Sequence, residues 1–384
     1  MQTLMITIGV AVGVAVIVFV TALIQGLQNN VIDRTLGTQA HIRLLMPDQR
    51  NIKAPLPTAT FELLQEDKRA QRLRSIDNWQ RLITALGART DLTAVSPVVS
   101  GPALALRGEA VESVALVGIN LERYQAIVPL SEYITSGQLR LGADDALIGS
   151  LLAEDLGVRV GSKIRLDTGQ ATSRVVTIAG IFELGVRELD ERYVYMDLKQ
   201  AQPLLDLVGG VTVIDLKVED IFTAETIAQQ VGRMTSLKAE SWIATNSQLM
   251  NALSAQSLST NMISFFVGIS VAFGIASVLS VSVVQRTREI GILRATGGTQ
   301  GQILRIFLLQ GALFGLFGSV FGIAVAYLLV GAFNTFGPGL FYIPIPPILV
   351  IIALGLATVT GVLAAATPAR RAARLDPVEA IRYV

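Results

Sequence analysis

The side chains best placed to interact with another molecule gather in one short segment, residues 285–299, which reads Gln-Arg-Thr-Arg-Glu-Ile-Gly-Ile-Leu-Arg-Ala-Thr-Gly-Gly-Thr. Ile290, Leu293 and Arg294 fall within about one helical turn of one another, which predicts a short amphipathic helix. The two glycines that follow are a common helix stop. Cations, one carboxylate and apolar side chains offer ion pairing and apolar contact, not bond-making chemistry. From these residues alone, a basic turn that anchors two membrane spans explains the segment equally well.

Motifs of catalysis and metal binding are absent from the sequence. It has no G-x-x-x-x-G-K-[ST] phosphate loop, no G-x-S-x-G nucleophile elbow and no H-E-x-x-H zinc motif. It has no cysteine, and its one histidine, His41, has no cluster of metal ligands around it, so we expect a structural role. The sequence has no basic run of the kind that follows the phosphate backbone of a nucleic acid, so we do not expect nucleic acid as a ligand. We therefore predict no enzyme activity, catalytic residue or metal site in this chain.

The elements that hold the segment in place are predicted to be membrane helices. Only 16% of the residues are charged, against about a quarter in soluble proteins. Three long stretches carry no charge, namely Met1–Ile32, Ser241–Gln285 and Ile306–Ala369. Because roughly 20 apolar residues in a helix span a bilayer, the first two stretches hold one span each and the third holds two. The third is broken at Asn334–Pro347.

The distribution of arginine predicts the orientation of these spans. Arginines concentrate in the link between spans 2 and 3 and in the C-terminal tail, so both segments are expected in the cytoplasm. With four spans the N-terminus is cytoplasmic as well, and the long segment after span 1 lies outside. The predicted segments are spans at residues 1–24, 262–284, 303–333 and 348–366, an external domain at 25–261, a cytoplasmic segment at 285–302, an external loop at 334–347 and a cytoplasmic tail at 367–384.

The external segment is predicted to be an α+β domain, since it mixes short β-rich runs with periodic, charged stretches. The predicted strands are Val114–Gly118, Lys163–Leu166, Arg174–Ile178, Tyr193–Met196 and Val211–Val218. The predicted helices are Gln25–Leu36, Phe61–Leu86, Ala224–Val231 and Ser247–Asn261. The first and last of these continue spans 1 and 2 as a stalk. The fold class is therefore an α-helical membrane protein with four transmembrane helices and a large α+β extracytoplasmic (periplasmic) domain between spans 1 and 2.

The composition of the spans limits the mechanism. The three uncharged stretches leave the membrane interior without the ionisable groups that proton relays and charged-filter channels need, so any energy is expected from a partner. Small residues recur four positions apart, which lets helix backbones approach closely, within the chain or across a dimer. The glycines predicted to pack helices are Gly9, Gly13, Gly311, Gly315, Gly318 and Gly322.

Two motifs carry a resemblance to a known family. The segment at residues 285–299 resembles the coupling helix of the FtsX/MacB superfamily of ABC transporter permeases, whose pattern is close to R-E-I-G-[IL]-[LM]-[RK]-A-[LIMT]-G. The ending Pro368–Tyr383 resembles the ending of the same superfamily, and the layout of one span, a large external domain and three spans is similar as well. The resemblance covers essentially the whole chain. Residues 25–42, 117–120 and 148–164 look most like lipoprotein-releasing (LolC/LolE-type) permeases.

The resemblance implies a permease of a type VII ABC transporter, which works by mechanotransmission in the bacterial inner membrane. Two copies, or this chain and a paralogue, would stand on a dimer of cytoplasmic ABC ATPases. ATP and Mg²⁺ would bind in the ATPase, and this chain would hold no cofactor. The residues implied to couple to the ATPase are Arg288, Glu289, Ile290, Ile292, Leu293, Arg294 and Gly297.

Three functions remain open at this point. The first is the extraction of a lipoprotein or other amphiphile from the outer leaflet, with a periplasmic carrier as a further partner. The second is MacB-like efflux of a drug, peptide or glycolipid with a membrane-fusion adaptor. The third is FtsX-like regulation of an external hydrolase, without transport.

Overall fold

The computed structural model describes residues 2–47, 73–169, 173–337, 339 and 341–374, and the chain divides into two compact units. The first, which we call the helical unit, comprises residues 1–32 and 249–384. The second, the inserted domain, comprises Asp33–Gln248. Residues 25–32 and 249–261, which we expected in the external domain, group with the helical unit because the helices that contain them continue without a break.

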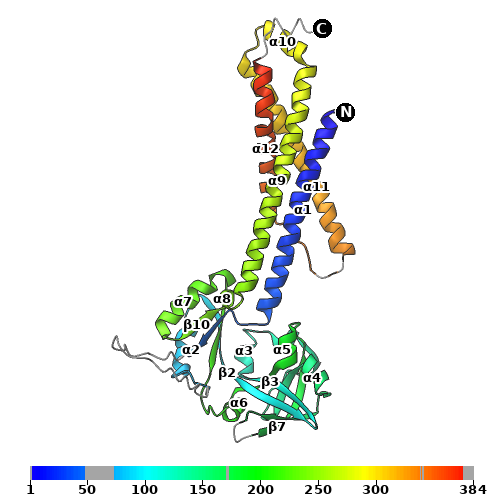
Figure 1. The fold of residues 1–384 in the computed structure, drawn as a ribbon. Coiled ribbons are helices and arrows are strands. Elements are labelled where there is room, and N and C mark those ends of the chain that lie inside the picture. The colour runs from blue at the N-terminus through cyan, green and yellow to red at the C-terminus, as the bar shows by residue number, and fades with distance from the viewer. Residues whose placement is uncertain (1, 48–72, 170–172, 338, 340, 375–384) are drawn as a thin grey trace, which may run out of the picture. The chain divides into compact units, whose positions relative to one another are not determined.

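The helical unit contains the membrane spans. Its helices are α1 (Gln2–Gly37), α9 (Ser247–Gln285), α10 (Thr287–Ala295), α11 (Gln300–Phe336) and α12 (Pro347–Ala373). Within the described part of the chain, four of them are long and apolar enough to cross a membrane, and only the short α10 is not. The prediction of four spans with a domain between the first and second is confirmed (Figure 1).

The inserted domain is built on one mixed sheet. Its strand order is β10-β1-β9-β2-β3-β8-β5-β7-β4, with β6 paired to β2 and β7. The strands are β1 (Ile42–Leu45), β2 (Leu92–Arg107), β3 (Ala110–Ile119), β4 (Ile134–Gly137), β5 (Asp145–Gly149), β6 (Lys163–Asp167), β7 (Ser173–Phe182), β8 (Tyr193–Asp197), β9 (Val213–Val218) and β10 (Lys238–Ser241). The helices are α2 (Trp79–Gly87), α3 (Leu121–Tyr124), α4 (Ser150–Asp155), α5 (Arg187–Arg192), α6 (Leu198–Leu204), α7 (Ala224–Thr235) and α8 (Trp242–Thr245), with short 3₁₀ turns at Leu130–Glu132 and Ile221–Thr223.

The five predicted strands correspond to β3, β6, β7, β8 and β9, whereas the longest strand, β2, was not predicted. Pro97 and Pro102 lie within β2 and argue against a strand, because proline cannot donate a ladder hydrogen bond. Each lies where β2 has a neighbour on one side only. Pro97 pairs with β9 before the pairing with β3 begins, and Pro102 pairs with β3 between the segments that face β9 and β6. Of the predicted helix Phe61–Leu86, residues 61–72 lie outside the described residues, and α2 begins only at Trp79.

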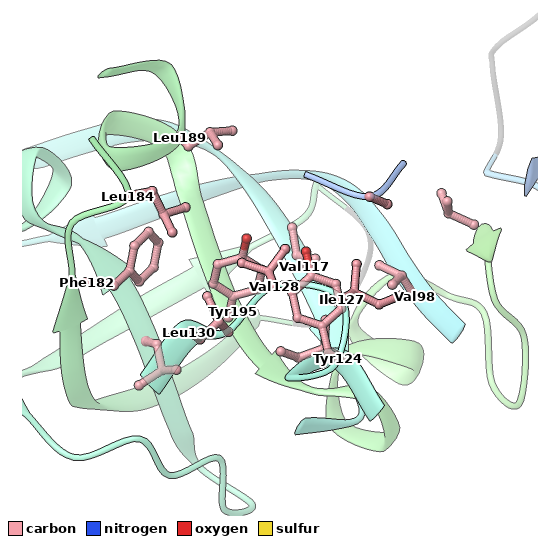
Figure 2. Close-up of a cluster of buried hydrophobic side chains, with 14 residues drawn as sticks. Val98, Val117, Tyr124, Ile127, Val128, Leu130, Phe182, Leu184, Leu189 and Tyr195 are labelled. Atoms are coloured by element: carbon pink, nitrogen blue, oxygen red, sulfur yellow. The ribbon is translucent and has the colours of Figure 1, made fainter. Parts of the chain in front are cut away.

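A buried aromatic cluster forms the core over one face of this sheet. The rings of Tyr124 and Phe182 lie 5.8 and 5.3 Å from that of Tyr195, which is fully buried (Figure 2). Aliphatic side chains from β2, β3 and the turn after α3 complete it, among them Val98, Val117 and Ile127. Burial of large rings in this geometry stabilises the domain beyond the simple removal of apolar area from water.

Candidate functional site

The predicted amphipathic segment is a helix, α10, held firmly between α9 and α11. Its first turn is tied back to α9, since the hydroxyl of Thr287 donates to the carbonyl of Val283 at 3.0 Å. Gly297 follows the helix with φ = 104°, a conformation that favours glycine. Thr299 and Gln302 then form a reciprocal capping box that starts α11. The turn is therefore defined on both sides by local hydrogen bonds.

The apolar side chains of α10 divide between two faces. Ile290 is 7% exposed and packs among Val283, Ile303 and Phe307. Our expectation that Ile290 contacts a partner is therefore wrong for this structure, because the side chain anchors α10 to α9 and α11. Ile292 and Leu293 are each 49% exposed and remain available to another protein.

The charged residues of α10 surround the exposed pair. Arg288 and Glu289 are exposed, and Arg294 is half-buried. An apolar centre with a charged rim is the usual composition of a protein–protein interface. Of the predicted coupling residues, Arg288, Glu289, Ile292, Leu293 and Gly297 are thus exposed, whereas Arg294 is half-buried and Ile290 is buried. We call the exposed set of Arg288, Glu289, Ile292 and Leu293 the α10 surface.

The predicted packing glycines bring the long helices together, with one exception. A Cβ atom on Gly315 would lie 2.4 Å from the carbonyl oxygen of Ala357 on α12, and one on Gly322 would lie 2.5 Å from that of Ala11 on α1. Gly311 and Gly318 make similarly close approaches to α12 and α1, and Gly13 approaches α9. By contrast, no atom of the described chain lies within 4 Å of a Cβ placed on Gly9. Gly9 therefore packs against no other helix among the described residues.

Gly9 instead lines an apolar groove of about 530 Å³ between α1 and α9. The groove also contains Gly13, Val16, Phe266 and Val278. The hydroxyl of Ser270, on the same wall, donates to the carbonyl of Phe266 at 3.0 Å and so leaves the lining largely without free polar groups. A groove of this composition suits hydrocarbon better than a hydrophilic solute. The groove could not be predicted from the sequence, because the pattern of either helix alone does not show how its surface faces the other helix.

A row of polar side chains crosses the sheet of the inserted domain. Arg43 on β1 pairs in register with Asp215 on β9, which pairs with Ser96 on β2. Nε of Arg43 lies 3.4 Å from Oδ1 of Asp215, whose side chain is nearly buried. Burial raises the pKa of Asp215, and the guanidinium of Arg43 partly opposes that shift. Among the described residues, the buried hydroxyl of Ser96 has no hydrogen-bond partner. The row shows no nucleophile–base pair, and we assign it to the fold.

Metal binding finds no support in the described residues, where no group of three or more His, Asp or Glu side chains is suitably placed. The candidate site therefore consists of the α10 surface on one segment and the apolar groove on two helices. The first exposes two apolar side chains beside charged ones, and the second has an almost entirely apolar lining.

Two protein families match this chain. The family described as MacB-like periplasmic core domain matches residues 3–234, and the family described as FtsX-like permease C-terminal matches residues 261–377. Together they cover α1, nearly all of the inserted domain and the helices that follow it.

The chain is similar over its length to lipoprotein-releasing system transmembrane proteins named LolC. It is 27% identical to that of Neisseria meningitidis serogroup B, over 80% of this chain and 83% of that protein. It is 25% identical to that of Xylella fastidiosa, over 98% of this chain and 92% of that protein. A macrolide export ATP-binding/permease protein MacB from a Shewanella species is 37% identical, but over 45% of this chain and 24% of that protein.

Solved structures include distant matches to part of this chain. The periplasmic region of MacB from Actinobacillus actinomycetemcomitans covers 57% of this chain and 96% of its own, at 10% identity and a TM-score of 0.37. The extracellular domain of the transporter YknZ covers 42% of this chain and 87% of its own, at 14% identity and a TM-score of 0.34.

Proposed function

Because the chain belongs to the FtsX/MacB family of ABC transporter permeases, we propose that it uses a partner ATPase to release a lipoprotein or similar amphiphile from the outer leaflet of the inner membrane. It is a multi-pass inner-membrane protein. The permease works with an ABC ATPase, and in this proposal ATP and Mg²⁺ bind there. A second permease copy or a paralogue completes the transporter.

The observation that carries the ATPase coupling is the exposure of Ile292 and Leu293 on a short helix between two membrane spans. Exposure of aliphatic side chains of this size to water is unfavourable, so a partner that covers them lowers the free energy. Arg288 and Glu289 beside them would pair with charges around an apolar socket and fix the orientation of docking. In this arrangement α10 and both chain termini lie in the cytoplasm. The arginines at residues 286, 288, 294 and 305 support that side, by the positive-inside rule.

The choice of an amphiphile rests on the groove between α1 and α9 and on the relatives. The groove lining offers apolar contact without ionisable groups, which suits an acyl chain rather than a charged solute. Relatives that match 80% and 98% of this chain are named for lipoprotein release, and these names support the choice, although a MacB relative also matches 98% of it. Displacement of α1 and α9 on ATP binding by the partner would then move the acyl chain of the amphiphile outward, and this movement needs no polar path across the bilayer.

Macrolide-type efflux is the second candidate, and two observations favour it. The MacB of an Azoarcus species is 27% identical over 98% of this chain. The identity to the Shewanella MacB is higher than to either LolC, although it extends over less than half of this chain. Under this alternative the external partner is a membrane-fusion adaptor instead of a lipoprotein carrier.

The test is affinity purification of the tagged chain from its native membrane in mild detergent, followed by mass spectrometry of the co-purifying proteins. We expect a P-loop ATPase together with a lipoprotein or a periplasmic lipoprotein carrier. An ATPase with a membrane-fusion adaptor selects efflux, and an ATPase with a cell-wall hydrolase selects a regulatory role. A folded preparation that retains no ATPase contradicts the coupling proposal.

A further inference from the structure

The connection from α11 to α12 is held in shape by one side chain of α11. Nδ2 of Asn334, in the last turn of that helix, donates to the carbonyl of Ile343 at 3.1 Å, and its Oδ1 accepts from the N–H of Ile343 at 3.0 Å. Both backbone polar groups of Ile343 are therefore paired within the chain. Pro344, Pro346 and Pro347 follow, and their fixed φ angles restrict the backbone on the way into α12.

The inner side of this connection packs on two helices of the helical unit. Ile343 is 1% exposed and lies in a cluster with Ala22 of α1 and Val330 of α11, which are also buried. The backbone comes close to α1 as well, since a Cβ on Gly26 would lie 3.0 Å from the carbonyl oxygen of Tyr342 and 3.2 Å from Cα of Ile343. The described part of the connection therefore lies against α1 and α11 and does not stand free of them.

The outer side of the connection carries two large exposed rings. Phe336, at the end of α11, is 87% exposed, and Tyr342 is 74% exposed. The sequence has no charged residue from Ile306 to Ala369, so the connection itself is uncharged. Tyrosine is enriched at membrane–water interfaces, where its apolar ring and its hydroxyl are both accommodated, and exposure of a phenylalanine ring to water is unfavourable. The composition of this face therefore fits the interface of a bilayer better than bulk water.

The length of α12 places the connection at such an interface. From Arg370, the first charged residue after the span, back to Pro347 the helix rises about 35 Å at about 1.5 Å per residue. The hydrocarbon core of a bilayer is about 30 Å thick. With Arg370 at one boundary of the core, Pro347 therefore lies at the opposite boundary. Irregular backbone near lipid is unfavourable unless its polar groups are paired, and Asn334 pairs those of Ile343.

We propose that Phe336 and Tyr342 insert into the headgroup layer of the bilayer, on the side opposite Arg370, and that phospholipid covers this face. In the orientation proposed above, this layer belongs to the outer leaflet. Asn334 acts as a positioning residue, because its pairing with Ile343 holds the connection on α1 and α11 with both rings exposed. The anchored connection then fixes the depth of α1, α11 and α12 in the membrane. The inference depends on the four spans and on neither the transported molecule nor the ATPase.

The test is site-directed spin labelling of the full chain in liposomes of phosphatidylcholine and phosphatidylglycerol. Because the chain contains no cysteine, Phe336→Cys and Tyr342→Cys each provide a single thiol for a nitroxide. Power saturation compares the accessibility of the nitroxide to oxygen, which concentrates in hydrocarbon, with that to a nickel chelate, which stays in water. Two exposed positions are controls. Leu328→Cys on α11 is the span control, and Val208→Cys in the inserted domain is the water control.

A ring in the headgroup layer predicts a ratio of oxygen to nickel accessibility between the two controls, about threefold or more above the water control and below the span control. A ratio equal to that of the water control would place both positions in water and overturn the inference. A ratio equal to that of the span control would place them in hydrocarbon and contradict the headgroup layer. Low accessibility to both reagents would show that protein covers the face, and would overturn the inference as well.

The positioning role is tested by Asn334→Ala in the Tyr342→Cys background. Without the amide, the backbone groups of Ile343 must pair with water, so we expect the ratio at position 342 to fall about twofold or more toward that of the water control. The matched control is Thr335→Ala, whose hydroxyl donates to the carbonyl of Gly331 within α11 at 2.8 Å, and it should leave the ratio unchanged. Equal ratios in the two variants would show that Asn334 does not position the connection.

Discussion

The backbones of α11 and α12 approach each other closely at Gly311 on α11 and Gly361 on α12. A Cβ on Gly311 would lie 2.5 Å from the carbonyl oxygen of Gly361, and a Cβ on Gly361 would lie 2.3 Å from that of Gly311. The contact is reciprocal, so neither helix can accept a side chain there without moving away from the other. Close approach of this kind maximises dispersion contacts where lipid provides no hydrophobic drive for helices to associate.

Gly361→Ala should therefore destabilise the helical unit. The added methyl group meets backbone, which cannot rotate aside, and overpacking of this kind costs about 1–3 kcal/mol. Thermal unfolding of the purified chain in mild detergent measures the loss. Gly355→Ala, on the same helix with no atom of the described chain within 4 Å of the new Cβ, is the matched control and should leave the midpoint unchanged or slightly raised. Equal midpoints for the two variants would refute the close crossing.

Leu293→Asp should uncouple the permease from its ATPase. Leu293 is half-exposed, so the change costs the isolated chain little, but it places a charge in the apolar centre of the proposed docking surface. We expect normal membrane insertion and thermal stability, with co-purification of the ATPase lowered about tenfold or more.

Ile290→Asp is the comparison for that variant. Ile290 is buried against α9 and α11, so its replacement should lower thermal stability as well as association. Retention of full ATPase binding by Leu293→Asp, in a chain that inserts normally, would show that the α10 surface is not the docking site.

The stability of the chain should fall with pH below about neutrality because of His41, the only histidine. Burial, with a smaller contribution from the charge of Lys217 on β9, lowers the pKa of His41 below the usual 6.5. The unfolded chain then binds a proton that the folded chain does not, so stability is lost as pH falls through 6.5 toward the folded-state pKa. Thermal midpoints from pH 7.5 to pH 5.5, compared between the wild type and His41→Gln, measure this effect. A difference between them that stays constant over this range contradicts the assignment.

Arg43→Met should destabilise the inserted domain more than the double variant Arg43→Met with Asp215→Leu. The single change leaves a buried carboxylate without its ion pair, whereas the double change replaces both charges with apolar groups. The expected loss is about 2–4 kcal/mol for the single variant, with most of it recovered in the double variant. A double variant as unstable as the single one would show that loss of the Arg43–Asp215 ion pair does not explain the loss of stability.

The membrane helices were predictable because one physical constraint dominates them. Long charge-free stretches indicate spans in lipid, and α1, α9, α11 and α12 contain most of their residues. The polar continuations of two of these helices were predictable as well, since the helices expected at Gln25–Leu36 and Ser247–Asn261 lie within α1, which ends at Gly37, and α9, which begins at Ser247. Gly361 could not be predicted from glycine pairs, because the small residue four positions before it is an alanine, Ala357.

The sheet was predictable in part. Strands with local alternation were found, but the order of the sheet depends on pairs distant in sequence, such as β1 with β10 and β3 with the parallel β8. No local pattern encodes those pairs. The assignment of Ile290 failed for a related reason, since a helix with apolar residues on two faces does not reveal which face the rest of the chain covers.

The pairing of β1 with β10 also bears on how such a chain arises. Entry to and exit from the inserted domain lie on neighbouring strands, about 4.8 Å apart. A domain whose ends lie together can be placed within a host chain without forcing the host segments apart. Exchange or loss of the domain by recombination therefore preserves the order of the four helices. Selection can thus diversify the inserted domain while it conserves the four-helix unit that we propose a partner ATPase drives.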